Sequence, residues 1–315
     1  MEKYVTILGG ANIDIVGKPY DNLNEYDSNP GSVKISFGGV GRNIAENLVK
    51  LGISTKLITA FGDDYFGKIL KTDLNNKGID ISTSFTFSDS NNSIYLALLD
   101  KEGEMVNAIN DMEIYNKVTI DLIKDKVDII NNSHVCVIDT NIPIDVIEFV
   151  VKTCTGTTFF LDPVSTVKAL KIKHLLPYFH TIKPNRYEAE VLSDIKIDNI
   201  LDLPKVTTYF TNQGVKRVFI SLGREGVYYG DKDYQTYYQP KEMKITNASG
   251  AGDAYLAALV YAYINKFSIE ETLRFAQGAS YLTLMSEDTV STSMSVNNIK
   301  KILQEMEDGK CIKTI

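Results

Sequence analysis

Short apolar runs alternate with segments of helical periodicity along this 315-residue chain, and that alternation restricts the folds open to it. Residues 4–8 (YVTIL) form one such run, which ends in two glycines and predicts a buried strand followed by a turn. Residues 135–139 and 158–162 predict two more strands, whereas 43–51 and 144–153 carry apolar residues at helical spacing. Strands alternating with helices predict an α/β fold, a mainly parallel sheet with helices on both faces. The same patterns predict strands 55–60 and 218–222 and helices 66–75, 188–192, 254–265, 269–283 and 296–306.

Three stretches depart from this alternation. Residues 32–37, 93–99 and 105–109 alternate apolar and polar side chains, which is typical of half-buried strands. We expect them to form antiparallel ribbons, inserted from about 13–37 and 82–110, that make a small β-sheet lid. No repeat or linker marks a second domain, so the sequence predicts one domain over all 315 residues.

Charge and composition exclude several classes of function. A net charge of −7 argues against a nucleic-acid partner, which normally requires an excess of basic residues. No apolar run is long enough to span a membrane, and no leader pattern precedes the first strand. Three widely separated cysteines, Cys136, Cys154 and Cys311, suit a reducing compartment. We therefore expect a cytoplasmic protein.

The segment 247–254 (NASGAGDA), directly before a predicted helix, is the strongest candidate for chemistry. Small residues such as Gly250, Ala251 and Gly252 let backbone amides at a helix N-terminus converge on one anion. Asp253 would place a carboxylate beside that anion site, an arrangement suited to deprotonating a hydroxyl that attacks a phosphoryl group. A helix start with a capping Asp has the same pattern, and the loop alone leaves both interpretations open.

Two further motifs carry polar residues at strand ends. Residues 37–43 (FGGVGRN) join a strand to a helix, where Gly39 permits close approach of a ligand and Asn43 can bind vicinal hydroxyls. Asn12 and Asp14 follow the first strand, at the edge where open α/β proteins bind ligands. A glycine-rich turn and an Asx turn are the structural alternatives.

Together these motifs resemble those of the ribokinase-like (PfkB) family of carbohydrate and nucleoside kinases, and the resemblance covers essentially the whole chain. The pair formed by Gly38 to Asn43 and Gly250 to Asp253, about 210 residues apart, is the most specific part of it. The segments 185–188 (NRYE) and 221–226 (SLGREG) match further family elements. Read without the family, 185–188 would be a helix cap.

The resemblance implies a ribokinase-like three-layer fold and a role for each matching residue. Asp253 is then the catalytic base, and the amides of Gly250, Ala251 and Gly252 form the anion hole. The implied contacts to sugar hydroxyls come from Asn12, Asp14, Gly39 and Asn43. Asn185 and Glu188 are implied to organise Mg²⁺ through water, and ATP is implied to lie along Ser221, Gly223, Gly226 and Gln277.

One position departs from the family pattern. Many ribokinases have an Asp three residues before the first glycine of the anion-hole loop, where it helps to bind a monovalent cation. This chain has Asn247 there, a weaker neutral ligand. The departure leaves the use of a monovalent cation open.

Within the family, the segments 9–15, 27–31 and 38–47 look like those of pseudouridine kinases. The resemblance implies transfer of phosphate to the ribose 5′-hydroxyl of this C-nucleoside, with the uracil under the lid. Ser28 and Lys168 are the candidate contacts to the base, although a surface lysine without a role is the alternative for Lys168. A ribokinase or another sugar or nucleoside kinase is the second hypothesis, and a non-catalytic nucleoside-binding protein is the third.

The lid also bears on assembly. An exposed antiparallel sheet has an unpaired edge and apolar faces, which pairing with a second lid would cover. Relatives commonly dimerise in this way. We therefore expect a homodimer formed through the lid.

Overall fold

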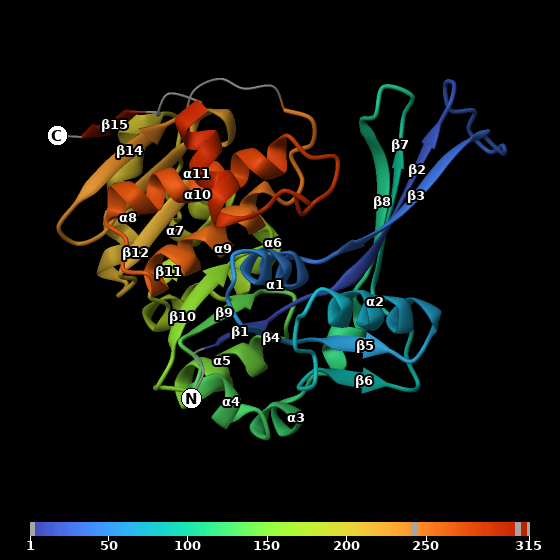
Figure 1. Ribbon diagram of the computed structural model, residues 1–315, viewed down its shortest axis with the longest axis horizontal. Helices are drawn as coiled ribbons and strands as arrows, with labels where there is room; N and C mark the ends of the chain where they lie inside the picture. The colour runs from blue at the N-terminus through green and yellow to red at the C-terminus, as the bar shows by residue number, and fades with distance from the viewer. Residues whose placement is uncertain (1–3, 241–244, 306–309, 314–315) are drawn as a thin grey trace.

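A nine-stranded sheet forms the centre of the computed structural model, which describes residues 4–240, 245–305 and 310–313 (Figure 1). Its strands lie in the order β15-β14-β13-β12-β11-β10-β9-β1-β4. The pairs from β4 to β12 are parallel, and those from β12 to β15 are antiparallel. The strands are β1 (Val5–Leu8), β4 (Thr55–Ile58), β9 (Val135–Asp139), β10 (Thr158–Asp162), β11 (Thr181–Ile182), β12 (Arg217–Ser221), β13 (Val227–Gly230), β14 (Gln235–Gln239) and β15 (Lys310–Lys313).

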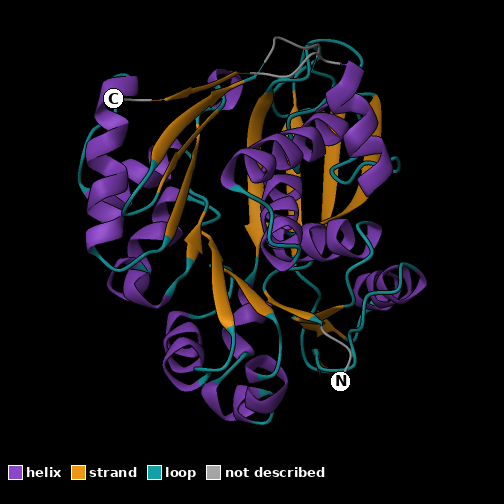
Figure 2. Ribbon diagram, turned by 60° about the vertical axis from the view of Figure 1, so that its left-hand side comes forward, coloured by secondary structure: helices purple, strands orange, loops and turns teal. Residues whose placement is uncertain are grey.

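Helices cover both faces of this sheet, so the described chain has three layers (Figures 1 and 2). Successive residues of β1 alternate between two cores, with Ile7 packed on one face and Leu8 on the other. This confirms the predicted α/β class. One face packs against α1 (Val40–Lys50), α2 (Tyr65–Asn76), α9 (Ala251–Ile264), α10 (Ile269–Leu284) and α11 (Val296–Glu305). The other packs against α3 (Ile120–Lys124), α4 (Val127–Asn131), α5 (Ile144–Thr153), α6 (Thr166–Lys171), α7 (Arg186–Ser193) and α8 (Leu203–Asn212).

A four-stranded sheet stands away from this body (Figure 1). It consists of β3 (Gly31–Gly38), β2 (Asn12–Pro19), β7 (Ile94–Leu99) and β8 (Met105–Asp111), in that order. Two antiparallel ribbons, β2–β3 and β7–β8, join through a parallel pairing of β2 with β7. We call this sheet the lid.

The sequence assigned too much of the chain to the lid. Of the segment 82–110, the part before Ile94 lies outside the four-stranded sheet, because β6 (Phe85–Phe87) pairs with β5 (Ala60–Gly62) in a separate two-stranded sheet. For the same reason the predicted strand 55–60 is divided: the chain leaves the main sheet after Ile58 and enters β5.

Other predicted elements differ only at their ends, and the strands 135–139 and 158–162 and the helix 144–153 match the structure. The predicted helix 296–306 matches α11 up to Glu305, and its last predicted residue, Met306, lies outside the described residues. The sequence missed β11, β13, β14 and β15, and also α3, α4, α6 and α8. In the described parts of the chain, no helix has the length and apolar character needed to cross a membrane.

Candidate active site

Polar side chains gather where the parallel strands end. Asp139 and Asp162 are the last residues of β9 and β10, Lys183 follows β11, and Ser221 ends β12. In an open α/β sheet the carboxyl ends of parallel strands share one edge, and loops at that edge form the ligand site. The helices α1 and α9 begin at the same edge and bring Asn43 and Asp253 to it.

The fully buried Asp139 carboxylate holds three of these loops together. Its Oδ2 accepts hydrogen bonds from the backbone N–H of Gly10 (2.7 Å) and of Gly41 (2.8 Å), and its Oδ1 accepts one from Asn141 N (2.8 Å). Burial raises the pKa of Asp139, while the N–H groups of Gly10 and Asn141 act in the opposite direction. The loop after β1, the start of α1 and the loop after β9 therefore share one anchor.

Gly250 gives the loop before α9 its shape. Its φ of 78° lies in the left-handed region, and a Cβ there would lie 1.9 Å from the carbonyl oxygen of Thr289. Only glycine fits. A Cβ on Gly252 would lie 3.3 Å from the Nζ atom of Lys183, so the lysine reaches the start of the helix. The first turn of α9 thus combines free backbone amides with an adjacent cation, which suits an anionic group.

Asp253 lies in that first turn and is buried. Asn43 Nδ2 donates a hydrogen bond to its Oδ2 at 2.8 Å, so the two motifs separated by 210 residues meet directly. Burial, helped by the carboxylate of Asp162, raises the pKa of Asp253 to about 7, against the lowering effects of Asn43 and Lys183. Such a carboxyl is close to half-ionised at neutral pH, which suits a general base.

Lys183 forms a buried ion pair with Asp162, at 3.3 Å between Nζ and Oδ2. Burial acts to lower the pKa of Lys183, but the carboxyls of Asp162, Glu188 and Asp253 outweigh it and raise the pKa above its ordinary value. The lysine therefore stays charged beside the start of α9.

The predicted sugar contacts lie together at the root of the lid. Asn12 begins β2, and its Nδ2 donates to Asp14 Oδ1. Burial raises the pKa of Asp14 to about 6, although Asn12 and the charge of Arg42 lower it. Gly39 has a φ of 100°, and a Cβ there would lie 2.5 Å from the carbonyl oxygen of Gly10. This close approach brings the glycine-rich loop against the turn after β1.

Asn185 and Glu188 form a capping box at the start of α7. Asn185 Oδ1 accepts from Glu188 N and Glu188 Oε2 accepts from Asn185 N, each at 2.9 Å. Both residues thus have the helix-cap role that the sequence alone suggested. Burial, with the neighbouring Asp162, raises the pKa of Glu188. No cluster of three metal-ligating His, Cys, Asp or Glu side chains occurs within the described residues.

The predicted nucleotide residues lie on two elements. Ser221 forms a β-bridge with Asn185, and Gly223 and Gly226 belong to the turn that follows. Gln277 is buried in α10, one turn before Ser280, whose hydroxyl donates to the carbonyl of Ala251 at 2.9 Å. The turn thus adjoins the cap of α7, and α10 packs against the start of α9.

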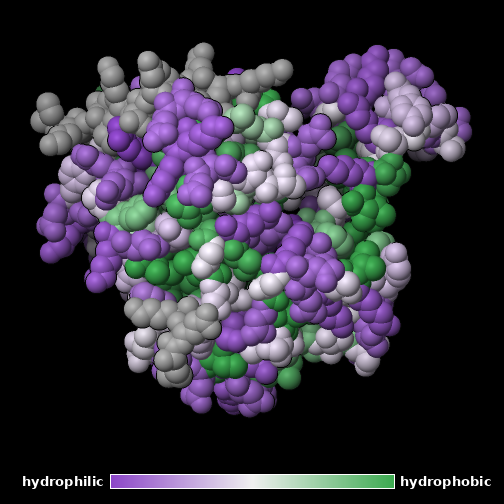
Figure 3. All heavy atoms as spheres, in the orientation of Figure 1, coloured by the Kyte–Doolittle hydropathy of each residue, from purple (hydrophilic) through white to green (hydrophobic). Residues whose placement is uncertain are grey.

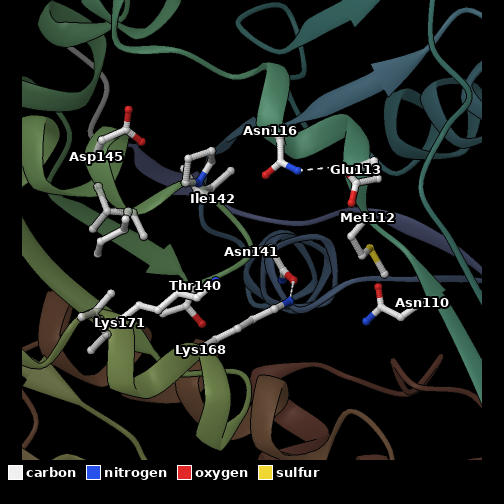
Figure 4. Close-up of a pocket in the computed structure, with 14 residues that line it drawn as sticks. Asn110, Met112, Glu113, Asn116, Thr140, Asn141, Ile142, Asp145, Lys168 and Lys171 are labelled. Atoms are coloured by element: carbon white, nitrogen blue, oxygen red, sulfur yellow. Dashed lines mark hydrogen bonds between the residues drawn. The ribbon is translucent and has the colours of Figure 1, made fainter.

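Lys168 lines a cavity of about 350 Å³ at the foot of the lid (Figure 4). Its ammonium group is directed at Asn141 and donates to the Oδ1 atom of that residue. Burial lowers the pKa of Lys168, as does the nearby Lys171. Other residues that line this cavity are Asn110, Met112, Glu113, Thr140 and Ile172.

Ser28 lies elsewhere. It belongs to the loop between β2 and β3, at the outer end of the lid (Figure 1), where its N–H donates to the carboxylate of Asp27. Among the described residues, no hydrogen bond or ion pair joins it to the cavity of Lys168.

Sequence reasoning missed several residues of this site: Arg42, Asp139, Asn141, Asp162 and Lys183. A signal was available for two of them, because Asp139 and Asp162 each end a strongly apolar strand run. Arg42 is the least expected, since a buried arginine inside a glycine-rich motif has no distinguishing pattern.

Known proteins that resemble this chain in sequence and fold are kinases. The model of the pfkB family carbohydrate kinases matches residues 2–295. The pseudouridine kinase of Escherichia coli (strain K12) is 38% identical over 305 residues, covering 96% of this chain and 97% of that protein. A carbohydrate kinase from Agrobacterium tumefaciens has a TM-score of 0.86 at 25% identity, covering 98% of this chain and all of that one.

A third relative shows the shared fold at lower identity. The ribokinase of Arabidopsis thaliana, solved with ribose and ATP, has a TM-score of 0.80 at 21% identity and covers 96% of this chain and 99% of its own. The expected ribokinase-like fold is confirmed. The chain belongs to the pfkB family of carbohydrate kinases and is a phosphotransferase that acts on a hydroxyl group of a sugar or nucleoside.

Proposed function

We propose that this kinase transfers the γ-phosphoryl group of ATP to the 5′-hydroxyl of pseudouridine. The observation that supports the kinase chemistry is the hydrogen bond between Asn43 and the buried Asp253, next to the glycine-containing loop at the start of α9. The cavity around Lys168, together with the relatedness to a pseudouridine kinase, supports the choice of substrate. Lid and body are proposed to act as one domain.

The chemical step follows from the first turn of α9. Asp253 accepts the proton of the sugar hydroxyl as the hydroxyl oxygen attacks the γ-phosphorus and the bond to the ADP oxygen breaks. The amides of Gly250, Ala251 and Gly252 stabilise the negative charge on the transferring group. The Lys183 ammonium, held beside Gly252, adds a fixed positive charge.

The sugar would lie against the root of the lid. The carboxylate of Asp14 and the amides of Asn12 and Asn43 offer acceptors and donors within one small region, which suits vicinal hydroxyls. Gly39 lets the sugar approach the backbone of its loop, since no Cβ intervenes.

The uracil would occupy the cavity at the foot of the lid. In a C-nucleoside both ring nitrogens keep their hydrogen, so the base has two N–H donors and two carbonyl acceptors. The ammonium of Lys168 can donate to a carbonyl, while the side-chain oxygens of Asn110, Asn141 and Glu113 can accept from N–H groups. Ser28 could contribute only through movement of the lid or from a second copy of the chain.

We propose that ATP and Mg²⁺ bind along the edge formed by the end of β12 and the start of α7. Mg²⁺ is a hard cation that keeps several waters and binds through few carboxylates. Glu188 suits this role, because its Oε1 atom lies outside the capping box that occupies Oε2. Ser221, Gly223, Gly226 and Gln277 would hold the nucleotide, and Asn185 would orient the waters of the metal.

The lid is proposed to form a homodimer interface. Several apolar side chains on its strands are exposed, among them Val33, Ile35, Met105, Val106 and Ile109. Figure 3 shows a hydrophilic outer end of the lid with hydrophobic atoms nearer the body. Exposed apolar strands with a free edge favour pairing with another copy.

A substrate panel tests the choice of nucleoside. With ATP and Mg²⁺ in excess, kcat/KM should be higher for pseudouridine than for uridine, ribose, adenosine or a hexose. Lys168→Met should lower kcat/KM for pseudouridine by roughly 3- to 10-fold, the effect of one hydrogen bond. Turnover of ribose serves as the internal control and should not change. Faster turnover of ribose, adenosine or a hexose would assign another substrate.

Asp253→Asn tests the base. The new amide is nearly isosteric and can still accept from Asn43, but it cannot take up the proton, so kcat should fall by about 10² to 10⁴. ATP binding, measured by calorimetry, should persist, and the melting temperature at pH 8 should not fall, because a buried carboxylate has been removed. Asp121→Asn on the exposed surface of α3 is the matched control. A variant that keeps more than about a tenth of kcat would show that Asp253 is only a structural residue.

The pH dependence of kcat/KM provides an independent test. Asp253 must be ionised to accept a proton, and its pKa is raised to about 7, so activity should increase as pH rises through this value. Bound ATP carries negative charge and should move the midpoint upward, not downward. With Mg·ATP held in excess, the limb should have a midpoint at or above about 7 and be absent from the residual activity of Asp253→Asn. A limb near pH 4 would contradict the raised pKa.

Sedimentation tests the lid interface. The chain should sediment as a dimer at micromolar concentration, and the double variant Ile35→Lys with Ile109→Lys should sediment as a monomer, because lysines on exposed strands oppose pairing. Ile200→Lys, in the segment directly before α8, is the control for an exposed apolar residue outside the lid. A wild-type monomer would refute the interface.

A further inference from the structure

Arg42 is a buried arginine in α1 whose only effect described so far is that its charge lowers the pKa of Asp14. Its guanidinium contacts Glu46 on the same helix and lies 3.6 Å from Asp73 of α2. Lys77 bonds to both of these carboxylates, at 3.0 Å to Glu46 and 2.9 Å to Asp73. A buried charge is costly unless it is paired, so this network fixes the guanidinium in one place.

The same guanidinium is bonded to the site. Arg42 Nη1 donates to the carbonyl oxygen of Phe37 at 3.0 Å and to Oδ1 of Asn43 at 2.9 Å. Asn43 in turn donates from Nδ2 to Asp253 at 2.8 Å. One unbroken chain of hydrogen bonds therefore runs from Glu46 through Arg42 and Asn43 to Asp253.

The order of donors in this chain matters. An asparagine amide has an oxygen that only accepts and an NH₂ group that only donates, and rotation by half a turn exchanges them. A guanidinium has donors and no acceptor. Beside Arg42, the oxygen of Asn43 must face the guanidinium, and the NH₂ group must then face Asp253.

We propose that Arg42 is a positioning residue, which fixes the Asn43 amide so that its NH₂ group faces Asp253 and favours the carboxylate form of the base. Arg42 does not touch the reacting atoms and acts through Asn43. The proposal rests on the proposed function, in which Asp253 takes the proton.

The surroundings of Asp253 make this one donor important. Asp162 at the end of β10 and Asp139 at the end of β9 oppose its ionisation, as does burial, whereas Lys183 after β11 and Asn43 of α1 favour it. If Arg42 is removed, the Asn43 amide is free to turn its oxygen toward Asp253. An acceptor in that place favours the protonated acid, so the pKa of Asp253 should rise further.

The test is the pH profile of Arg42→Met, measured as kcat/KM for the nucleoside with Mg·ATP in excess. The midpoint of the acidic limb should move upward by about one pH unit, so that activity well below the midpoint falls roughly tenfold. At pH 9, where Asp253 is ionised in either protein, kcat should stay within about threefold of the wild type. A midpoint that does not move overturns the proposal.

Lys77→Met is the matched control. It removes one positive charge from the same network but breaks no bond to Asn43. If Arg42 acts through the amide, the midpoint for Lys77→Met should stay near that of the wild type. An equal shift in both variants would show that net charge alone is responsible and would overturn the proposal.

A second variant keeps the test valid if Arg42→Met folds poorly. Replacing Arg42 by Met and Glu46 by Gln together removes the buried pair without leaving a lone charge, and it should give the same upward shift. Thermal melts identify which protein is folded. If Asp253→Asn stays active, the base assignment and this inference fail together; if that variant is inactive while the Arg42 profiles match the wild type, only this inference fails.

Discussion

The buried carboxylate of Asp139 is the interaction on which the site depends. Sheet topology brings strand ends to one edge, but it does not specify how the loops beyond them are arranged. Asp139 supplies that arrangement by accepting N–H groups from Gly10, Gly41 and Asn141 at once. This arrangement also requires glycine at position 9, because a Cβ on Gly9 would lie 2.3 Å from the Asp139 carboxylate. The loop after β1, the start of α1 and the loop after β9 are therefore positioned relative to one another by a single residue.

Negative charge exceeds positive charge among the buried side chains at this edge of the sheet. Asp139, Asp162 and Asp253 lie close enough to influence one another, and Lys183 is the cation that the pKa of Asp253 responds to. Burial and the neighbouring carboxylates raise the pKa of Asp253, so this carboxyl has a greater tendency to hold a proton. The excess of carboxylates also gives a divalent cation an electrostatic reason to bind nearby, before any ligand contact is counted. Basicity and metal attraction thus have a common origin.

Much of the fold could be predicted from the sequence, because strands such as β9 and β10 are short, unbroken apolar runs, a pattern typical of strands buried on both faces. The two-residue strand β11 and the antiparallel strands β13 to β15 carry too little local pattern, and tertiary pairing decides them. In the site, the glycine motifs were visible because backbone geometry restricts the residue type. Lys183 was not, because its partner Asp162 is distant in sequence. The four-residue spacing of Arg42 and Glu46 is local, but exposed ion pairs on helices have the same spacing, so it does not reveal that this pair is buried.

The lid is joined to the body where the residues proposed to bind the sugar lie. Asn12 is the first residue of β2 and Gly38 the last of β3, so the strand ends next to the proposed sugar site form the base of the lid. The loop that holds Ser28 lies at the other end of the same two strands (Figure 1). A small tilt of β2 and β3 at the base of the lid would therefore move the loop at their other end by a larger distance. A fluorescent label on that loop would therefore report occupancy of the proposed sugar site from a distance.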